Sequence, residues 1–159
     1  MTHKIAILMD PIGKINIKKD SSFAMLVEAK KRKHQLYYLE QSDLMLKDGC
    51  VHARVRRLDV FEDPTKWYQL EQPEIVPLHS MDSLLMRKDP PFDMEFVYTT
   101  YLLELAQNQG LLVVNDARSL RDHNEKLFTA LFPQCCTEML VTRSESELRQ
   151  FISLHKDVI

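Results

Sequence analysis

The sequence is poor in glycine and cysteine, and each shortage excludes a kind of site. It has three glycines in 159 residues, too few for a glycine-rich loop that cradles phosphate or for a Gly-x-Gly-x-x-Gly dinucleotide fingerprint. Its three cysteines are Cys50 and the adjacent Cys135 and Cys136, and an odd number with a vicinal pair is a poor disulfide framework. We therefore expect reduced thiols and a cytoplasmic protein.

The sequence also lacks long apolar runs, an excess of one charge and the spacing of a metal site. No apolar stretch approaches the roughly 18 residues of a membrane span, and the N-terminus has no signal-peptide pattern. A net charge of −2 gives no general attraction to nucleic acid or anionic membranes. The six histidines are not spaced as metal ligands. We expect no metal site in this chain, no nucleic-acid or membrane partner, and small molecules or proteins as partners.

Short apolar strands alternate with amphipathic helices along the chain. This alternation predicts an α/β fold with a Rossmann-like, mostly parallel sheet and helices on both faces. Strands are predicted at residues 5–9, 35–39, 83–87 and 111–115, and helices at 21–33 and 93–109. Asp20 or Ser21 is the expected N-cap of the first helix, and Gly110 is the expected C-terminal stop of the second.

A β-hairpin interrupts this alternation at residues 44–55. Asp48-Gly49 is the strongest short-range signal for a two-residue hairpin turn. Residues 59–80 contain three prolines and no clean periodicity. We interpret them as a surface connection with a short helix around Trp67.

The C-terminal part is predicted to continue the pattern and then to stop within it. A helix from 119 or 122 to 132, a strand at 139–142 and a helix at 144–155 are expected, the last opened by capping-box spacing at Ser144. An apolar strand begins at 157–159, where the chain ends. We expect this sequence to be a fragment of a longer polypeptide.

Charged residues follow two of the predicted parallel strands. Asp10 comes directly after the first strand, and the third strand ends in Arg87, Lys88 and Asp89 before a double proline. Ligands of open α/β sheets bind beyond the carboxyl ends of the strands. We therefore expect one anion-holding cleft, with Met9-Asp10 and Arg87-Lys88 on the same rim.

Several longer segments resemble the N-terminal half of the prokaryotic glutathione synthetase family, whose members are ATP-grasp ligases. The similarity spans essentially the whole chain, and its motifs occur in the same order. They are Asp-Pro-Ile at 10–12 with 15–25, Met-Arg-Lys-Asp-Pro-Pro-Phe-Asp at 86–93, and Ser-Leu-Arg-Asp at 119–122 with Asn-Glu-Lys-Leu-Phe-Thr-Ala at 124–130. The resemblance implies a pre-ATP-grasp substrate-binding domain at 1–122 and the truncated start of an ATP-grasp domain at 123–159.

The resemblance also implies a reaction and its ligands. ATP would phosphorylate the cysteinyl carboxylate of γ-glutamylcysteine, and the amine of glycine would displace the phosphate, with Mg²⁺ and cations neutralising charge. The family's glycine-rich loop, second phosphate-binding lysine and Mg²⁺ ligands match positions beyond Ile159. We expect no catalytic residues in this chain and no ligase activity from it alone. The complete protein is expected to be a homo-oligomer.

The matching positions suggest residue roles, each with a simpler alternative. Arg87 resembles the family's substrate-site arginine, or it forms an ion pair with Asp89 or Asp93. Ser21 and Ser22 would hold a substrate carboxylate, or they only cap a helix. Asp10 would hold an ammonium group, or it bonds the following turn. We place Lys88 and Asp89 in the same substrate-binding cleft. Lys126 resembles a lysine that reaches the nucleotide phosphates, or it is a solvated helix residue.

The sequence alone is also compatible with three other functions. The chain is a ligand-binding module without catalysis, an oligomerisation module, or part of another ATP-grasp amide ligase such as one that joins two D-alanines. The segment at 87–93 favours the glutathione branch.

Overall fold

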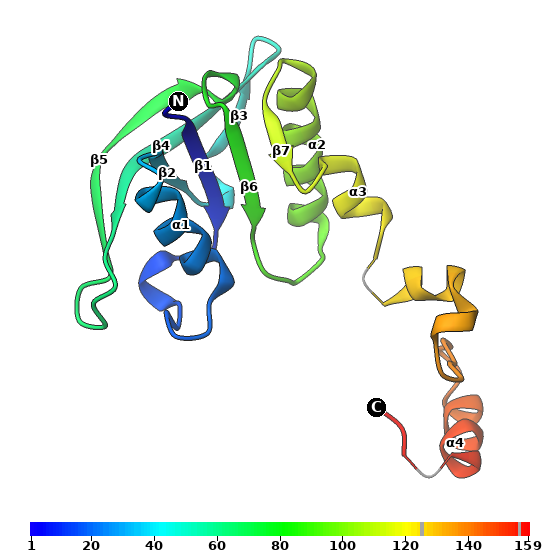
Figure 1. The fold of residues 1–159 in the computed structure, drawn as a ribbon. Helices are drawn as coiled ribbons and strands as arrows, with labels where there is room; N and C mark the ends of the chain where they lie inside the picture. Colours follow the sequence, from blue (N-terminus) through cyan, green and yellow to red (C-terminus); the bar gives the residue numbers. More distant parts are fainter. Residues whose placement is uncertain (125, 156) are drawn as a thin grey trace. The chain divides into compact units, whose positions relative to one another are not determined.

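The computed structural model describes residues 1–124, 126–155 and 157–159 and divides the chain into two compact units (Figure 1). The first unit is Met1–Asp122 and the second is His123–Ile159.

A seven-stranded sheet forms the centre of the first unit, counted over the described residues. Its order is β3-β4-β2-β1-β6-β7, with β5 paired to β4. The strands β2, β1, β6 and β7 are parallel neighbours, which confirms the predicted parallel sheet. Their bounds and those of the other strands are β1 Lys4–Met9, β2 Gln35–Leu39, β3 Leu44–Lys47, β4 Cys50–Val60, β5 Tyr68–Pro77, β6 Ser83–Arg87 and β7 Leu112–Val114.

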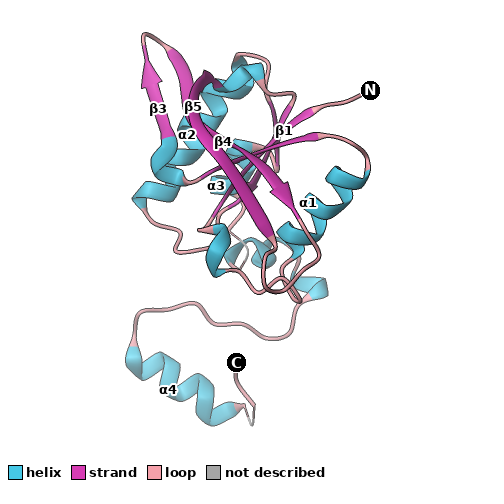
Figure 2. Ribbon diagram, turned by 90° about the vertical axis from the view of Figure 1, so that its left-hand side faces the viewer, coloured by secondary structure: helices cyan, strands magenta, loops and turns pink. Residues whose placement is uncertain are grey.

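Helices cover both faces of the sheet, as predicted (Figure 2). Successive residues of a strand point to opposite faces. Ile7 of β1 therefore packs in one apolar cluster with Phe23 and Leu26 of α1 (Ser21–Lys31), and its neighbour Leu8 packs in a second cluster with Leu103 of α2 (Met94–Asn108). The middle of β1, Ala6 to Leu8, is fully buried on both sides, as expected for a central parallel strand.

The predicted N-cap and stop signals are confirmed. The side chain of Asp20 accepts a hydrogen bond from the N–H of Phe23, and Asp93 does the same for Phe96 at the start of α2. Gly110 follows α2 with φ of 107°, a left-handed conformation that glycine adopts without strain. The first helix ends at Lys31, two residues before its predicted end, and Lys33 has a φ of 64°.

The predicted hairpin is present, and the antiparallel part of the sheet is larger than expected. Asp48 and Gly49 both have positive φ, 50° and 75°, as the tight turn between β3 and β4 requires. The interpretation of residues 59–80 as a surface connection with a helix around Trp67 is wrong, because β4 runs on to Val60 and β5 pairs with it antiparallel. Proline is tolerated in β5 because it is an edge strand.

The C-terminal helices are shorter than predicted. The helix expected up to residue 132 ends at Asp122 as α3 (Ala117–Asp122), and a separate 3-10 helix covers Leu127–Leu131. A further 3-10 turn spans Pro133–Cys135. The last predicted helix is α4 (Glu145–Leu154), where the hydroxyl of Ser144 accepts a hydrogen bond from the N–H of Glu147.

The strands predicted at 139–142 and 157–159 are wrong. These residues have no ladder partner and lie outside regular structure. An apolar run becomes a strand only where another strand completes its hydrogen bonds, and the described residues of the second unit contain none.

Candidate functional site

The ends of three neighbouring parallel strands meet at one edge of the sheet. Met9 is in register with Arg87, and Leu8 with both Met86 and Leu39. Asp10, Lys88 and Glu40 each follow one of these strands. The structure thus places Met9-Asp10 and Arg87-Lys88 on the same rim.

Asp10 joins the first strand end to the loop after β6. One of its carboxylate oxygens lies 3.0 Å from the ammonium nitrogen of Lys88, and the other accepts the N–H of Asp89 at 3.1 Å. The side chain of Lys88 is only 17% exposed, and its ammonium also donates to the carbonyl of Asp89 at 2.6 Å. Asp10 therefore bonds a loop, but the loop after β6 and not the turn after β1.

Arg87 donates its hydrogen bonds to two serine hydroxyls. Its Nε lies 3.0 Å from the Oγ of Ser22, and its Nη2 lies 2.7 Å from the Oγ of Ser21. In the part of the chain that the structure describes, neither Asp89 nor Asp93 pairs with it, since Asp93 caps α2. Because both hydroxyls are neutral, these two bonds do not compensate the positive charge of Arg87. A guanidinium has five N–H donors, so the others can bind an anion.

Ser21 and Ser22 are the first residues of α1 but are not its caps. Asp20 fills that role, which leaves both hydroxyls oriented toward Arg87. The helix thereby places its N-terminus, the guanidinium and the hydroxyls around one small hollow of about 220 Å³. Its lining consists of Met9, Asp10, Ile15, Lys19, Asp20, Ser21, Ser22, Arg87 and Asp89.

A second hollow of about 260 Å³ lies against Asp10 and is mainly acidic. Its lining consists of Met9, Asp10, Pro11, Glu40, Gln41, Ser42, Lys88 and Glu95. Each hollow is lined by three carboxylates, but the first also has two cations, Lys19 and Arg87, and the second only Lys88. A substrate carboxylate therefore fits best beside Arg87 in the first hollow, and an ammonium group fits best in the second. Asp10 lines both.

Three lining residues, Lys19, Glu40 and Glu95, are not among the predicted site residues. Glu40 directly follows the strand at 35–39, so the same strand-end argument that identified Asp10 applies to it. Lys19 and Glu95 had no comparable signal, because a loop and a helix bring them to the site.

Tyr38 fixes the loop after β1. Its hydroxyl accepts the N–H of Ile12 at 3.3 Å and donates to the carboxylate of Glu40 at 2.6 Å. Burial, followed by the hydrogen bond to Glu40, raises the pKa of the Tyr38 phenol well above its ordinary value of 10.0. The phenol therefore stays protonated and holds the Glu40 side chain beside Ile12.

Lys126 belongs to the second unit. Its backbone N–H donates to the Oδ1 of Asn124 at 3.1 Å, and it precedes the 3-10 helix at Leu127–Leu131. The motif that suggested its role includes residue 125, which lies outside the described residues.

Three observations bear on other kinds of site. Cys50, Cys135 and Cys136 are all free thiols. Across residues 1–124, 126–155 and 157–159, no three His, Cys, Asp or Glu side chains converge as metal ligands would. None of the helices in these ranges combines the length and apolar character that a membrane crossing requires.

Comparison with known proteins gives consistent matches. Residues 3–121 match the family model described as prokaryotic glutathione synthetase, N-terminal domain. The glutathione synthetases of Pseudomonas putida and Coxiella burnetii are 54% and 52% identical over all 159 residues, and that of Escherichia coli O6:H1 is 53% identical over 156 residues. The chain spans about half the length of these curated relatives. It belongs to the prokaryotic glutathione synthetase family, whose N-terminal domain it contains.

Proposed function

We propose that the complete protein joins γ-glutamylcysteine to glycine with the energy of ATP, and that the first unit holds the dipeptide. ATP would supply the phosphoryl group that activates the cysteinyl carboxylate, and Mg²⁺ would neutralise charge on it. The observation that supports this most is Arg87, a cation held by two neutral hydroxyls beside a small polar hollow.

The residues around Asp10 divide the work of holding a zwitterionic substrate. Arg87, with Ser21 and Ser22, binds a carboxylate through its planar fork. Asp10 attracts the ammonium group. Lys88 and Asp89 position Asp10 through the contacts already described, so that the two halves of the cleft stay in register.

The second unit is, in this proposal, the start of the ATP-grasp domain. Lys126 contacts the nucleotide phosphates in the complete protein, and the first unit is the substrate domain. The family's Mg²⁺ ligands and its phosphate-cradling loop match positions beyond Ile159. The three glycines of this chain are too few to form such a loop. The 159-residue chain alone therefore has no ligase activity.

A titration of the 159-residue chain with γ-glutamylcysteine, followed by NMR, tests the substrate site. We expect shifts at Ser21, Ser22 and Arg87, and a loss of affinity of roughly 10- to 100-fold in Arg87→Gln, because a charge-assisted hydrogen bond is lost. Arg32→Gln, which removes an exposed arginine of the same unit, is the matched control.

Two results would contradict the proposal. If Arg87→Gln binds the dipeptide as tightly as the unchanged chain, Arg87 is not a substrate residue. If the purified chain releases phosphate from ATP in a glycine-dependent reaction, it is not inactive.

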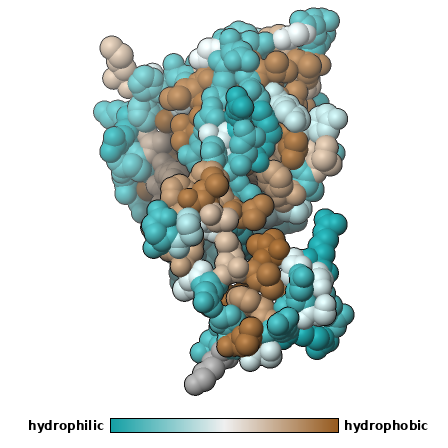
Figure 3. Space-filling view, turned by 90° about the vertical axis from the view of Figure 1, so that its right-hand side faces the viewer, coloured by the Kyte–Doolittle hydropathy of each residue, from teal (hydrophilic) through white to brown (hydrophobic). Residues whose placement is uncertain are grey.

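We also propose that the complete protein is a cytoplasmic homo-oligomer. Exposed apolar side chains recur along α2 at the spacing of a helix-packing stripe, namely Met94, Tyr98, Tyr101 and Leu105. Figure 3, which views the side on which α2 lies, shows apolar patches between polar ones. Self-association of this chain in sedimentation would support a contact through the stripe, and a monomeric chain beside an oligomeric complete protein would place that contact elsewhere.

A further inference from the structure

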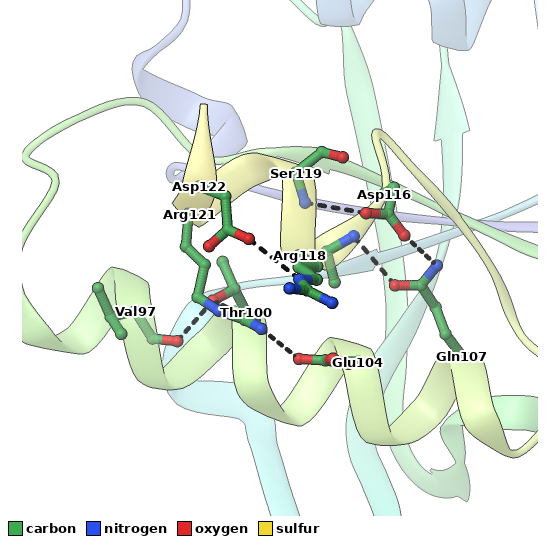
Figure 4. Close-up of polar contacts among 10 residues, drawn as sticks. Val97, Thr100, Glu104, Gln107, Asp116, Arg118, Ser119, Arg121 and Asp122 are labelled. Atoms are coloured by element: carbon green, nitrogen blue, oxygen red, sulfur yellow. Dashed lines mark hydrogen bonds and ion pairs between the residues drawn. The ribbon is translucent and has the colours of Figure 1, made fainter. Parts of the chain in front are cut away.

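The short helix α3 is attached to the first unit mainly through α2. It has six residues, too few to be stable by themselves. Ala117 is completely buried, and Leu120 packs against the same apolar cluster as Leu103. Polar contacts with α2 then fix both ends of α3 (Figure 4).

Gln107 of α2 holds the start of α3. Its Oε1 accepts the N–H of Ala117 at 3.0 Å, and its Nε2 donates to Asp116 at 3.1 Å. Asp116 accepts the N–H of Ser119 at 2.9 Å with its other oxygen, as a helix cap does. The side-chain amide of Gln107 thus uses both its donor and its acceptor on α3.

Arg121 holds the end of α3. Its Nη2 lies 2.5 Å from a carboxylate oxygen of Glu104, and its Nη1 donates to the hydroxyl of Thr100 at 3.3 Å. Its guanidinium also lies 4.5 Å from the centre of the Tyr101 ring. The side chain is only 14% exposed. Figure 4 shows Arg121 reaching down from α3 to successive turns of α2.

This arrangement is better suited to orientation than to stability. Glu104 is 37% exposed, so solvent screens part of the attraction in this half-buried ion pair. The desolvation of Arg121 offsets another part, and the net contribution of the pair to stability is small. Three contacts with one planar guanidinium nevertheless admit few orientations. A neighbouring ion pair, Arg118 with Asp122, is mostly exposed and lies within α3 itself. It therefore does not attach α3 to α2.

The other end of α2 belongs to the candidate site. Its cap Asp93 ends the loop that contains Lys88 and Asp89, and Glu104 lies ten residues after Met94, about 15 Å along the helix. One rigid helix therefore carries the substrate loop at its start and the Arg121 contacts further on. The first unit ends at Asp122, which directly follows Arg121 and lies four residues before Lys126.

We propose that Arg121 is a positioning residue, which fixes the orientation of α3, the last helix of the substrate domain, on α2. This inference rests on the proposed function, because it assumes that substrate and nucleotide must be brought into register. In this role Arg121 acts through Glu104, Thr100 and Tyr101 and not through contact with a ligand.

Kinetics of a full-length synthetase that carries this chain as its first half test the proposal. We expect Arg121→Met to lower kcat by about 100-fold, since small misplacements of reacting groups have effects of that order, with KM for γ-glutamylcysteine unchanged. Arg121→Lys keeps the charge but loses the planar fork. Its kcat should lie between that of the unchanged protein and that of Arg121→Met. Arg118→Met removes the exposed arginine of the same helix and should leave kcat unchanged.

A double substitution separates positioning from stability. Arg121→Met with Glu104→Leu replaces the ion pair by apolar side chains and should restore the unfolding midpoint without restoring kcat. If the double variant recovers both, Arg121 has only a structural role and the proposal is overturned.

A distance measurement tests the same idea without any activity. Non-cysteine spin labels at the exposed positions 108 and 122 of the 159-residue chain report how α3 is held on α2. We expect one narrow distance distribution in the unchanged chain and in Arg118→Met, and a broader one in Arg121→Met. Equal widths in all three overturn the proposal. A full-length protein without ligase activity, combined with broadening in Arg121→Met, would contradict the proposed function and leave the anchoring role intact.

Discussion

Asp116 shows how one carboxylate can make the first unit sensitive to acid. The N–H of Ser119, and next the side-chain amide of Gln107, hold the pKa of this carboxyl below its ordinary value of 3.8. These bonds favour the charged form in the folded state only. The stability that they contribute is therefore complete above the unfolded pKa, and it is lost as the pH falls through the lower folded pKa.

Replacing Asp116 by Asn should remove this contribution. We expect a lower urea midpoint than that of the unchanged chain at pH 7, and a difference that shrinks as the pH falls below 3.8. Urea unfolding at a series of pH values measures it. Asn108→Ala, at an exposed position without a titrating group, is the control and should differ from the unchanged chain by a constant amount. A difference for Asp116→Asn that persists at the lowest pH would show that the charge is not responsible.

At the residue scale, the sequence allowed the strand-end residues to be predicted better than their partners. Asp10, Arg87 and Lys88 lie together because parallel strands deliver their carboxyl ends to one edge, a rule that depends on no side-chain detail. The bonds from Arg87 to Ser21 and Ser22 could not be predicted, because they depend on Asp20 taking the capping role. Whether these residues bind substrate stays a proposal.

Among the elements, the β3–β4 hairpin depends most on residues that are close together in the sequence. Its turn contains Gly49 with a φ of 75°, and a Cβ added there would meet no other atom within 4 Å. Any effect of a larger residue at this position therefore comes from the backbone conformation and not from a clash.

Gly49→Ala should destabilise the first unit by about 1 kcal/mol, because a left-handed conformation is unfavourable for a residue with a Cβ. Chemical denaturation measures this difference. Asp48→Asn, at the neighbouring turn position with a φ of 50°, is the control, since asparagine tolerates this region. If both substitutions have the same effect, the turn conformation is not what makes glycine necessary.

Elements with a local signal were predictable, and those that depend on a partner were not. The turn at Asp48-Gly49, the cap Asp20 and the stop Gly110 involve residues close in sequence, and all three were confirmed. The strand β5 was missed because its prolines resemble a loop, and only the extension of β4 makes it a strand. The strand expected at 139–142 is apolar enough but has no partner.

For the whole molecule, the division into two units has consequences for folding. Both apolar clusters are formed by residues of the first unit. In the second unit, none of the described residues is buried, and many large apolar side chains, such as Leu131 and Leu154, are exposed. The first unit should therefore fold without the second.

A chain of residues 1–122 should unfold cooperatively, with the same midpoint as the 159-residue chain, because no core residue is removed. Circular dichroism during thermal unfolding measures both. Limited proteolysis should cleave after residue 122 before it cleaves within the first unit. Loss of cooperative unfolding in the shorter chain would mean that the second unit contributes to the core of the first.

The free edge of β5 also affects how copies of this protein behave when they meet before folding is complete. Open strand edges invite addition of a strand from another chain, which is how ordered aggregates grow. Pro73 lacks the N–H that such a ladder needs, and Glu71 and Glu74 on either side of it repel the same residues of a second copy. The proline that made β5 look like a loop in the sequence therefore also protects newly made copies from associating along this strand.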